Sequence, residues 1–113
     1  MENEFITWQD FEKVKLKVGT IIHAEVFKEA RKPAYKLKID FGEFGIKKTS
    51  AQITKRYTTE QLINKQVVAV VNFPPKQIAN FMSECLILGA LGEAGDVTLL
   101  TPDAEVTNGS DIA

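Results

Sequence analysis

Residues 71–89 read VNFPPKQIANFMSECLILG, and this stretch says more about the fold than any other part of the chain. An apolar run over residues 67–71 precedes the pair Pro74-Pro75, and a second apolar run covers residues 85–91. Short runs rich in Val, Ile and Leu and bounded by Pro or Gly are typical of buried strands. Because a proline nitrogen cannot donate a hydrogen bond, strand pairing must end at the proline pair. The stretch therefore predicts two buried strands joined by a loop on a rigid scaffold, where binding groups are often found.

The segment from Val14 to Val26 predicts a long first strand. Its even-numbered residues are apolar or small, so we expect them on one face, with the odd-numbered residues on the other. This segment is long for a strand, and Gly19 near its centre predicts a sharp bend or a bulge. A long, bent first strand can serve both halves of a small barrel.

The remaining elements are short. Residues 35–41 alternate between apolar and polar and predict a second strand, and residues 46–53 predict a third strand of mixed polarity. Capping boxes predict short helices after Thr7 and Thr58. Together with the two buried strands and a late hairpin around residues 92–100, they predict an all-β fold. The predicted fold is a five-stranded Greek-key barrel with a helix between the third and fourth strands, which is the arrangement of an OB-fold.

The whole chain, residues 1–113, is expected to form a single domain. We interpret residues 1–12 as an N-terminal helix or arm and residues 101–113 as a C-terminal extension. No apolar run approaches the roughly 20 residues of a membrane span, and the acidic start lacks the features of a secretory signal, so membrane insertion is not expected. A single cysteine, Cys85, cannot form an internal disulfide and suits a reducing compartment, which predicts a cytoplasmic protein.

Charge is strongly segregated along the chain. All fourteen Lys and Arg residues lie between Lys13 and Lys76, where only five acids occur, so this window carries a net charge of +9. The two ends hold ten acids and no Lys or Arg, and the sum is −1. Such segregation favours a basic surface for an anionic partner, and ordinary solvation is the alternative.

Catalysis is not predicted. The chain has one histidine and one cysteine, His23 and Cys85, which are far apart in sequence. Cys85 lies within an apolar run and is interpreted as a buried structural thiol. No residues show zinc-ligand spacing, and no glycine-rich phosphate loop is present. We therefore predict no enzyme, no metal and no cofactor.

Binding is the better interpretation. Five lysines share the outward parity of the first two strands and would form one lysine-rich face if those strands pair: Lys13, Lys15, Lys17, Lys36 and Lys38. Further basic residues follow near the third strand and the prolines: Lys47, Lys48, Lys55, Arg56 and Lys76. Lysine suits contacts with phosphate, although solubility and protection of strand edges are the alternatives.

Aromatic and apolar residues accompany this charge. Tyr57 and Phe73 are candidates for stacking on bases, and packing in the core is the alternative for both. Four residues around the prolines are candidates for polypeptide contact: Phe73, Ile78, Phe81 and Met82. Methionine suits adaptable surfaces, and an exposed apolar patch there would serve a partner or a dimer interface.

Three motifs carry a resemblance to a known family: FEKVKLKVGTI at residues 11–21, TSAQITKRY at residues 49–57, and residues 71–89. Together they resemble the small tRNA-binding-domain family, which is built on an OB-fold. The likeness is closest to the CsaA branch, whose members are protein-export-related molecular chaperones. The resemblance implies a homodimer in which the N- and C-terminal segments help to form the interface. The candidate interface residues are Trp8, Phe11, Pro102 and Ile112.

The resemblance also implies positions for RNA binding around the family's nucleic-acid-binding loops. The candidates are Ser50, Asn72, Lys76 and Ser83, with Lys48, Lys55 and Arg56 added from the charge pattern. Two motifs depart from the tRNA-binding relatives, which have Ser-Gly at Ser50-Ala51 and Ser-x-Gly-Met at residues 83–86. Asn80 replaces a common loop glycine, and asparagine tolerates left-handed geometry. These departures place the chain in the chaperone branch.

The sequence thus predicts an ATP-independent chaperone that captures unfolded or export-bound polypeptides in an apolar groove rimmed by lysines. The expected partners are a second copy of the chain and precursor polypeptides, with an export motor subunit as a further candidate. The alternative function is a stand-alone tRNA-binding module that recognises tRNA through a basic face. A pure dimerisation or scaffold module is the third possibility.

Overall fold

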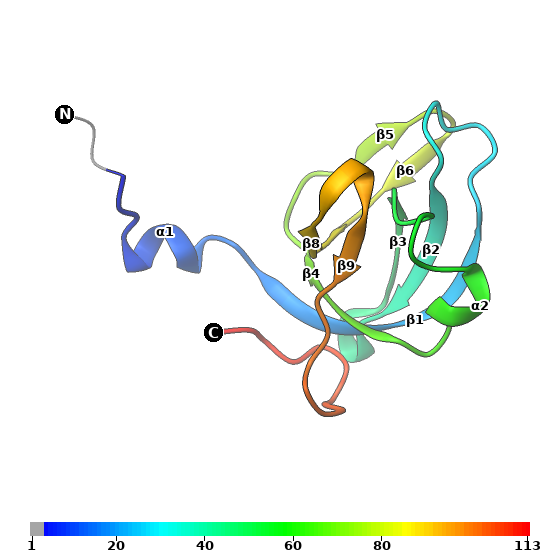
Figure 1. Ribbon diagram of the computed structural model, residues 1–113. Helices are drawn as coiled ribbons and strands as arrows, with labels where there is room; N and C mark the ends of the chain where they lie inside the picture. Colours follow the sequence, from blue (N-terminus) through cyan, green and yellow to red (C-terminus); the bar gives the residue numbers. More distant parts are fainter. Residues whose placement is uncertain (1–3) are drawn as a thin grey trace.

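A computed structural model describes residues 4–113, and most of their regular secondary structure is β-strand (Figure 1). The strands are β1 (Leu16–Val26), β2 (Tyr35–Asp40), β3 (Ile46–Ala51), β4 (Gln66–Val70), β5 (Lys76–Ile78), β6 (Phe81–Ser83), β7 (Leu86–Ile87), β8 (Gly89–Leu91) and β9 (Val97–Leu99). The helices are short: α1 (Trp8–Glu12), α2 (Thr59–Leu62), and the 3-10 turns η1 (Gly42–Phe44) and η2 (Glu93–Gly95).

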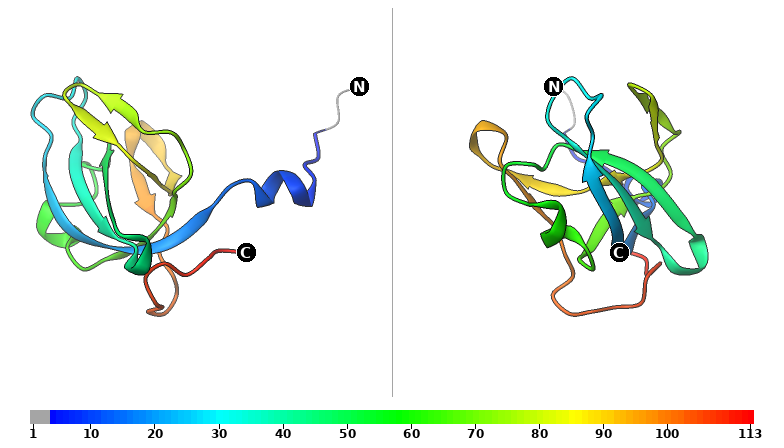
Figure 2. Two further views of the ribbon diagram at one scale, coloured as in Figure 1. Left: turned by 180° about the vertical axis from the view of Figure 1, so that it is seen from behind. Right: turned by 90° about the vertical axis from the view of Figure 1, so that its right-hand side faces the viewer.

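Five antiparallel strands form one sheet in the order β3-β2-β1-β4-β7, and this sheet curls into a nearly closed barrel (Figures 1 and 2). Strand β1 serves both halves, because its first half pairs with β4 and its second half with β2, the two ladders meeting at Thr20. Helix α2 lies between β3 and β4. The predicted all-β, five-stranded barrel is therefore confirmed.

The barrel interior is filled by the apolar side chains of the alternating strands. Tyr35, Leu37, Ile39 and Phe41 all point inward and are buried, as the alternation of β2 predicts. They pack with residues from β1, β4 and α2 in one continuous core. The period-two pattern of this strand therefore correctly identifies the inner face.

The predicted facing of β1 is wrong along part of its length. Before the bulge the odd-numbered Ile21 belongs to the buried core, whereas after it the even-numbered Ala24 packs against that core. The cause is a bulge between Ile21 and His23, which shifts the register against β2 and exchanges the two faces. Strand β1 thus bends as expected, but the bulge lies beyond Gly19.

The C-terminal extension covers the outer side of β1. Its main chain pairs with β1 where the NH of Val18 donates to Ser110 and the NH of Ile112 donates to Leu16. The Lys17 ammonium lies 2.6 Å from the carboxylate of Asp111. This segment, residues 107–112, acts as an added edge strand and explains why Val18 is buried away from the barrel interior.

The second predicted buried strand, residues 85–91, is two short strands in the structure. Strand β7 pairs with β4, and this pairing ends at Leu88. Strand β8 then pairs with β9 and not with the barrel sheet. Leu86 and Leu91 are exposed, so this run is only partly buried. The loop after the prolines is itself a hairpin of β5 and β6, and Ala79, not Asn80, takes the left-handed conformation there.

Helix α1 begins with the predicted capping box of Thr7 and Asp10, and it stands away from the barrel on an extended arm (Figures 1 and 2). Trp8 is 84% exposed and Phe11 is 37% exposed. Residues 1–3 of the predicted arm lie outside the described residues. Within residues 4–113, none of the helices is long and apolar enough to cross a membrane.

Candidate functional site

A cluster of lysines occupies the outer surface of β2 and β3. Strand register places Lys36 opposite Ser50 and Lys38 opposite Lys48, and residues directly opposite each other share a face. The inward residues of β2 are buried, so these four side chains point outward. We call them the basic face. In the described chain no carboxylate lies within 4.0 Å of these three lysine ammonium groups, so their charges are open to a ligand.

The predicted lysine-rich face is wrong in its membership. Lys36 and Lys38 face Glu25 and His23 on β1, because the ladder between β1 and β2 starts only at Thr20. The three lysines before that point lie along the part of the chain that pairs with β4 or precedes β1. The basic face therefore joins β2 to β3 and leaves out Lys13, Lys15 and Lys17.

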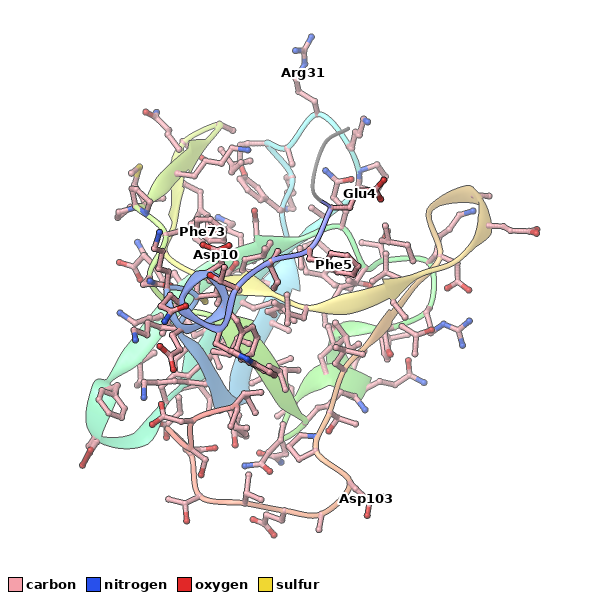
Figure 3. All side chains as sticks on the ribbon, turned by 90° about the vertical axis from the view of Figure 1, so that its left-hand side faces the viewer. Glu4, Phe5, Asp10, Arg31, Phe73 and Asp103 are labelled. Atoms are coloured by element: carbon pink, nitrogen blue, oxygen red, sulfur yellow. The ribbon has the colours of Figure 1, made fainter. Side chains whose placement is uncertain are left out.

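The hairpin of β5 and β6 overhangs one end of this face and creates a groove. The first part has a volume of about 570 Å³ and the adjoining part about 330 Å³. Together they form what we call the hairpin groove. Its lining residues are Ala30, Arg31, Lys32, Ala34, Ser50, Gln52, Phe73, Pro74, Lys76, Ile78, Ala79, Ser83, Cys85 and Leu86. Arg31 projects outward from the connection between β1 and β2 (Figure 3).

Side chains, in place of a regular ladder, hold the floor of the groove together. Thr49 is buried and donates to the carbonyl of Cys85 at 2.7 Å, and its hydroxyl lies 3.0 Å from that of Ser83. The Ser83 hydroxyl also accepts from the NH of Ser50. Glu84 bridges to Lys48 through both its main-chain NH and its carboxylate. These bonds close the barrel between β3 and the β6–β7 segment.

Cys85 lies on the floor of both parts of the groove. It is a free and buried thiol. Burial raises the pKa of the Cys85 thiol to about 11, so the side chain is protonated at neutral pH. A thiol in this state packs as a small apolar group and is a poor nucleophile.

The residues predicted for polypeptide contact are divided by the hairpin. Phe73 and Ile78 line the groove. Phe81 packs edge-on against Phe27 at 5.4 Å, so it anchors the hairpin on the barrel. Met82 pairs with Gln77 on the opposite face of the hairpin and is exposed.

Two lysines of the basic face lie over these aromatic rings. The ammonium of Lys36 is 5.2 Å from the centre of the Phe27 ring and 5.7 Å from that of Phe81. The ammonium of Lys48 is 5.3 Å from the centre of the Phe81 ring. Such cation–π contacts hold a charge near an aromatic surface without neutralising it. Phe27 was missed by the sequence analysis, since nothing local marks it as part of a site.

The residues predicted for RNA binding fall in four places. Ser50, Lys76 and Ser83 line the groove, and Lys48 lies on the basic face. Lys55 and Arg56 lie elsewhere, next to Asp96. Arg56 donates two hydrogen bonds to Asp96, at 2.9 and 2.5 Å, and this pairing raises the pKa of Arg56 and lowers that of Asp96.

Asn72 has a fourth location, and its side-chain amide is already engaged. Its side chain accepts from the NH of Lys15 at 2.9 Å and donates to the carbonyl of Lys13 at 2.7 Å, which ties the arm to the end of β4. Tyr57 packs against the core, and its hydroxyl accepts from the NH of Leu99. For Tyr57 the structure thus favours the packing alternative over stacking on bases.

Three of the four residues predicted for the dimer interface lie together. Trp8, Phe11 and Ile112 line a hollow of about 620 Å³ with Val14 and Leu16, which we call the terminal groove. Pro102 lines a separate, polar hollow with its neighbour Asp103. Asp103 lies at the opposite end of the molecule from Arg31 (Figure 3).

Gln52, Ala34 and the basic pair Arg31-Lys32 also line the groove, although no sequence pattern identified them as site residues. The pair could have been suspected from its charge, but its place beside β3 depends on the fold. Among residues 4–113, no group of three His, Cys, Asp or Glu side chains is arranged to hold a metal ion.

Comparison with known proteins gives a consistent result. The family model described as "Putative tRNA binding domain" matches residues 16–111. The chaperone CsaA of Bacillus anthracis is 58% identical with a TM-score of 0.93, over 96% of this chain and 99% of that one. The CsaA chaperone protein of Picrophilus torridus is 56% identical with a TM-score of 0.90, over 96% and 100% of the two chains.

Longer proteins also contain a similar region. A methionine–tRNA ligase of Leptospira biflexa is 39% identical over 108 residues, which is 96% of this chain but 16% of the ligase. The chain therefore spans about a sixth of the length of the curated relatives that it matches. A protein of Pyrococcus horikoshii described as MetRS-related, that is, related to methionine–tRNA ligase, is 30% identical with a TM-score of 0.87, over 98% of this chain and 100% of that one.

Proposed function

Because the chain belongs to the tRNA-binding-domain family, and resembles its CsaA-type members over nearly its whole length, we propose that it is an ATP-independent molecular chaperone. It binds unfolded or export-bound polypeptides reversibly in the hairpin groove, as a binding protein and not an enzyme. The observation that carries this proposal is the groove itself, which has apolar walls and a basic rim.

The chemistry of the groove suits extended segments of varied sequence. Phe73, Pro74, Ile78 and Leu86 provide apolar surface, and Phe73 and Leu86 are about half exposed in the free protein. The hydroxyl of Ser83 is engaged within the barrel, so it offers little directional hydrogen bonding to a ligand. Apolar contact without directional bonds tolerates many sequences.

The basic rim adds long-range attraction. Arg31, Lys32 and Lys76 surround the groove, and the lysines of the basic face continue it along β2 and β3. Charges of this kind increase the rate of encounter with acidic segments more than the final affinity. Nothing in this arrangement requires nucleotide hydrolysis, so capture and release follow mass action.

We extend the proposal to a cytoplasmic homodimer, with precursor polypeptides and an export motor subunit as its partners. Support for the dimer comes from the terminal groove, where Trp8 is 84% exposed beside Phe11 and Ile112. Apolar surface of this kind is normally covered by a partner. The single-domain boundaries predicted from sequence, with a terminal arm and extension, belong to the same proposal.

Suppression of aggregation tests the chaperone function. An unfolded client, such as chemically denatured citrate synthase, is diluted into buffer with increasing amounts of the protein, and light scattering is recorded. We expect suppression near equimolar dimer, and Phe73→Ala should raise the required concentration about fivefold because a half-exposed aromatic side chain no longer contributes apolar burial.

Phe44→Ala is the matched control, since Phe44 is similarly exposed but lies in the turn between β2 and β3. It should leave suppression unchanged. Absence of suppression by the unaltered protein at a fivefold excess of dimer would refute the chaperone function. Equal losses in both variants would show that the hairpin groove is not the binding site.

A second candidate function is binding of tRNA, which the family model and the unpaired lysines of the basic face favour. Anisotropy of labelled bulk tRNA measures it at increasing salt. If about five phosphates are contacted, log K falls against log salt with a slope of about −4, and removing Lys36, Lys38 and Lys48 together should reduce that slope by about 2 to 3. A slope that the triple variant leaves unchanged would exclude the basic face as the contact surface.

A further inference from the structure

Two carboxylates lie beside the lysines of the basic face: Glu84 accepts from the main-chain NH of Lys48, and Glu25 belongs to the sheet itself. Glu25 on β1 lies opposite Lys36 on β2, and His23 lies opposite Lys38. Lys38 in turn lies opposite Lys48 on β3. The bulge in β1 is what turns Glu25 to the outside, since without it the parity of this half of the strand would be reversed.

Glu25 lies near the positive charges of Lys36 and Lys38 but forms no ion pair with either lysine. Its carboxylate lies 3.0 Å from Nε2 of His23, and no lysine of the basic face lies within ion-pair distance of it. The hydrogen bond from His23, followed by the charges of Lys36, His23 and Lys38, lowers the pKa of Glu25. The carboxylate is therefore ionised at neutral pH, and it remains about half exposed.

Glu25 is the acid best placed to oppose a ligand on this face. The other outward acid on β1, β2 and β3 is Asp40, at the far end of β2, where it accepts from the NH of Gly42 and supports the turn. Among residues 4–113, the Glu25 side chain makes no hydrogen bond to main chain that would tie it to the fold in the same way. Its charge can thus be removed without removing a structural support.

We propose that Glu25 is a specificity-determining residue, whose charge weakens the binding of polyanions such as single-stranded RNA to the basic face. A continuous polyanion must place phosphates beside Lys36 and Lys38, and Glu25 repels them there. An unfolded polypeptide of mixed charge can place a basic or neutral residue at that position instead. The inference builds on the proposed function, because it concerns the choice between polypeptide and RNA on one surface.

A charge series tests the proposal. Glu25→Gln and Glu25→Lys change the charge by one and two units, and Glu43→Gln and Glu43→Lys are the matched controls in the turn after β2. Dissociation constants are measured for a labelled 12-nucleotide single-stranded RNA and for a labelled unfolded peptide of zero net charge. A unit charge about 7 Å from a phosphate in water changes affinity about threefold, and salt screens this effect.

We expect Glu25→Gln to tighten RNA binding about threefold at 25 mM salt and Glu25→Lys about tenfold, with less than 1.5-fold change at 0.5 M salt. The Glu43 variants should stay within 1.5-fold, and peptide binding should change less than twofold in all variants. Equal effects at positions 25 and 43, equal effects on RNA and peptide, or no RNA binding by any variant at 50 μM would each overturn the proposal. If RNA binding follows the charge while no variant binds the peptide, Glu25 keeps this role and the chaperone function fails.

Discussion

Gly19→Ala should destabilise the barrel by about 2–3 kcal/mol, although it adds only one methyl group. A Cβ at this position would lie 2.6 Å from Cγ2 of Ile39 and 2.8 Å from the ring of Phe41. Ordinary contacts between carbon atoms need about 3.5 Å or more, so the neighbours must move. Both are fully buried inside the barrel and cannot turn toward solvent.

Two opposing effects determine the size of this loss. In a strand, alanine is favoured over glycine by about 0.5–1 kcal/mol, because the unfolded chain loses less freedom on folding. Overpacking a well-filled core costs about 1–3 kcal/mol and occasionally more. With two buried neighbours displaced by nearly 1 Å, the upper part of that range applies, and the net loss corresponds to a fall in Tm of about 10 °C.

Urea unfolding followed by far-UV circular dichroism measures the effect. Fluorescence is unsuitable, since Trp8 is exposed on the arm and does not report on the barrel. Gly92→Ala is the control, because a Cβ there would meet only Asp96 at 3.2 Å or more in an exposed turn. In an Ile39→Ala background the cost of Gly19→Ala should fall by at least about 1 kcal/mol. A neutral or stabilising Gly19→Ala, or strictly additive double-variant energies, would refute this account of close packing.

Three further outcomes are expected. Asn72→Ala should make tryptic cleavage of the arm about fivefold faster while changing tRNA affinity less than twofold, because the Asn72 side chain is bonded to the main chain of the arm. A loss of tRNA affinity without faster cleavage of the arm would contradict this. Cys85 should react with iodoacetamide at pH 8 at least about a hundredfold more slowly in the native than in the unfolded protein, because burial raises the pKa of its thiol to about 11. Mass spectrometry follows the reaction. Rapid labelling of the native protein would show that the groove floor is open to solvent. Arg56 lowers the pKa of Asp96 in the folded state, so the stability that this pair contributes is present above the ordinary pKa of 3.8 and is lost as pH falls below it. The urea midpoint should therefore fall less between pH 6 and 2.5 in Asp96→Asn than in the unaltered protein. Identical pH profiles of the two proteins would contradict this assignment.

Local patterns determined much of the fold from sequence alone. The strict alternation of residues 35–41 identified the inner face of β2, and the capping boxes at Thr7 and Thr58 located both α-helices. The pair Pro74-Pro75 marked the interruption between β4 and the hairpin of β5 and β6. Such features involve residues within a few positions of one another, so the sequence contains all the information they need.

The candidate site was predicted less completely, because it depends on residues far apart in sequence. Ser50, Lys76 and Ser83 were identified and do come together, since they lie in motifs that the family resemblance covers. The engagement of Asn72 with the arm, and that of Arg56 with Asp96, had no local signal. A polar side chain that the sequence suggests for ligand binding can already have its hydrogen-bonding groups engaged within the folded protein.

Sequence patterns alone predicted the barrel, its five strands and the concentration of positive charge in residues 13–76. The tertiary structure was needed to establish which lysines share a face, because a bulge in β1 exchanges the two sides of that strand and strand register selects each neighbour. It placed Glu25 beside Lys36, and it left Lys17 paired with Asp111 at the other end of β1. Periodicity specifies how residues alternate along a strand, whereas register is set by the packing of the whole barrel.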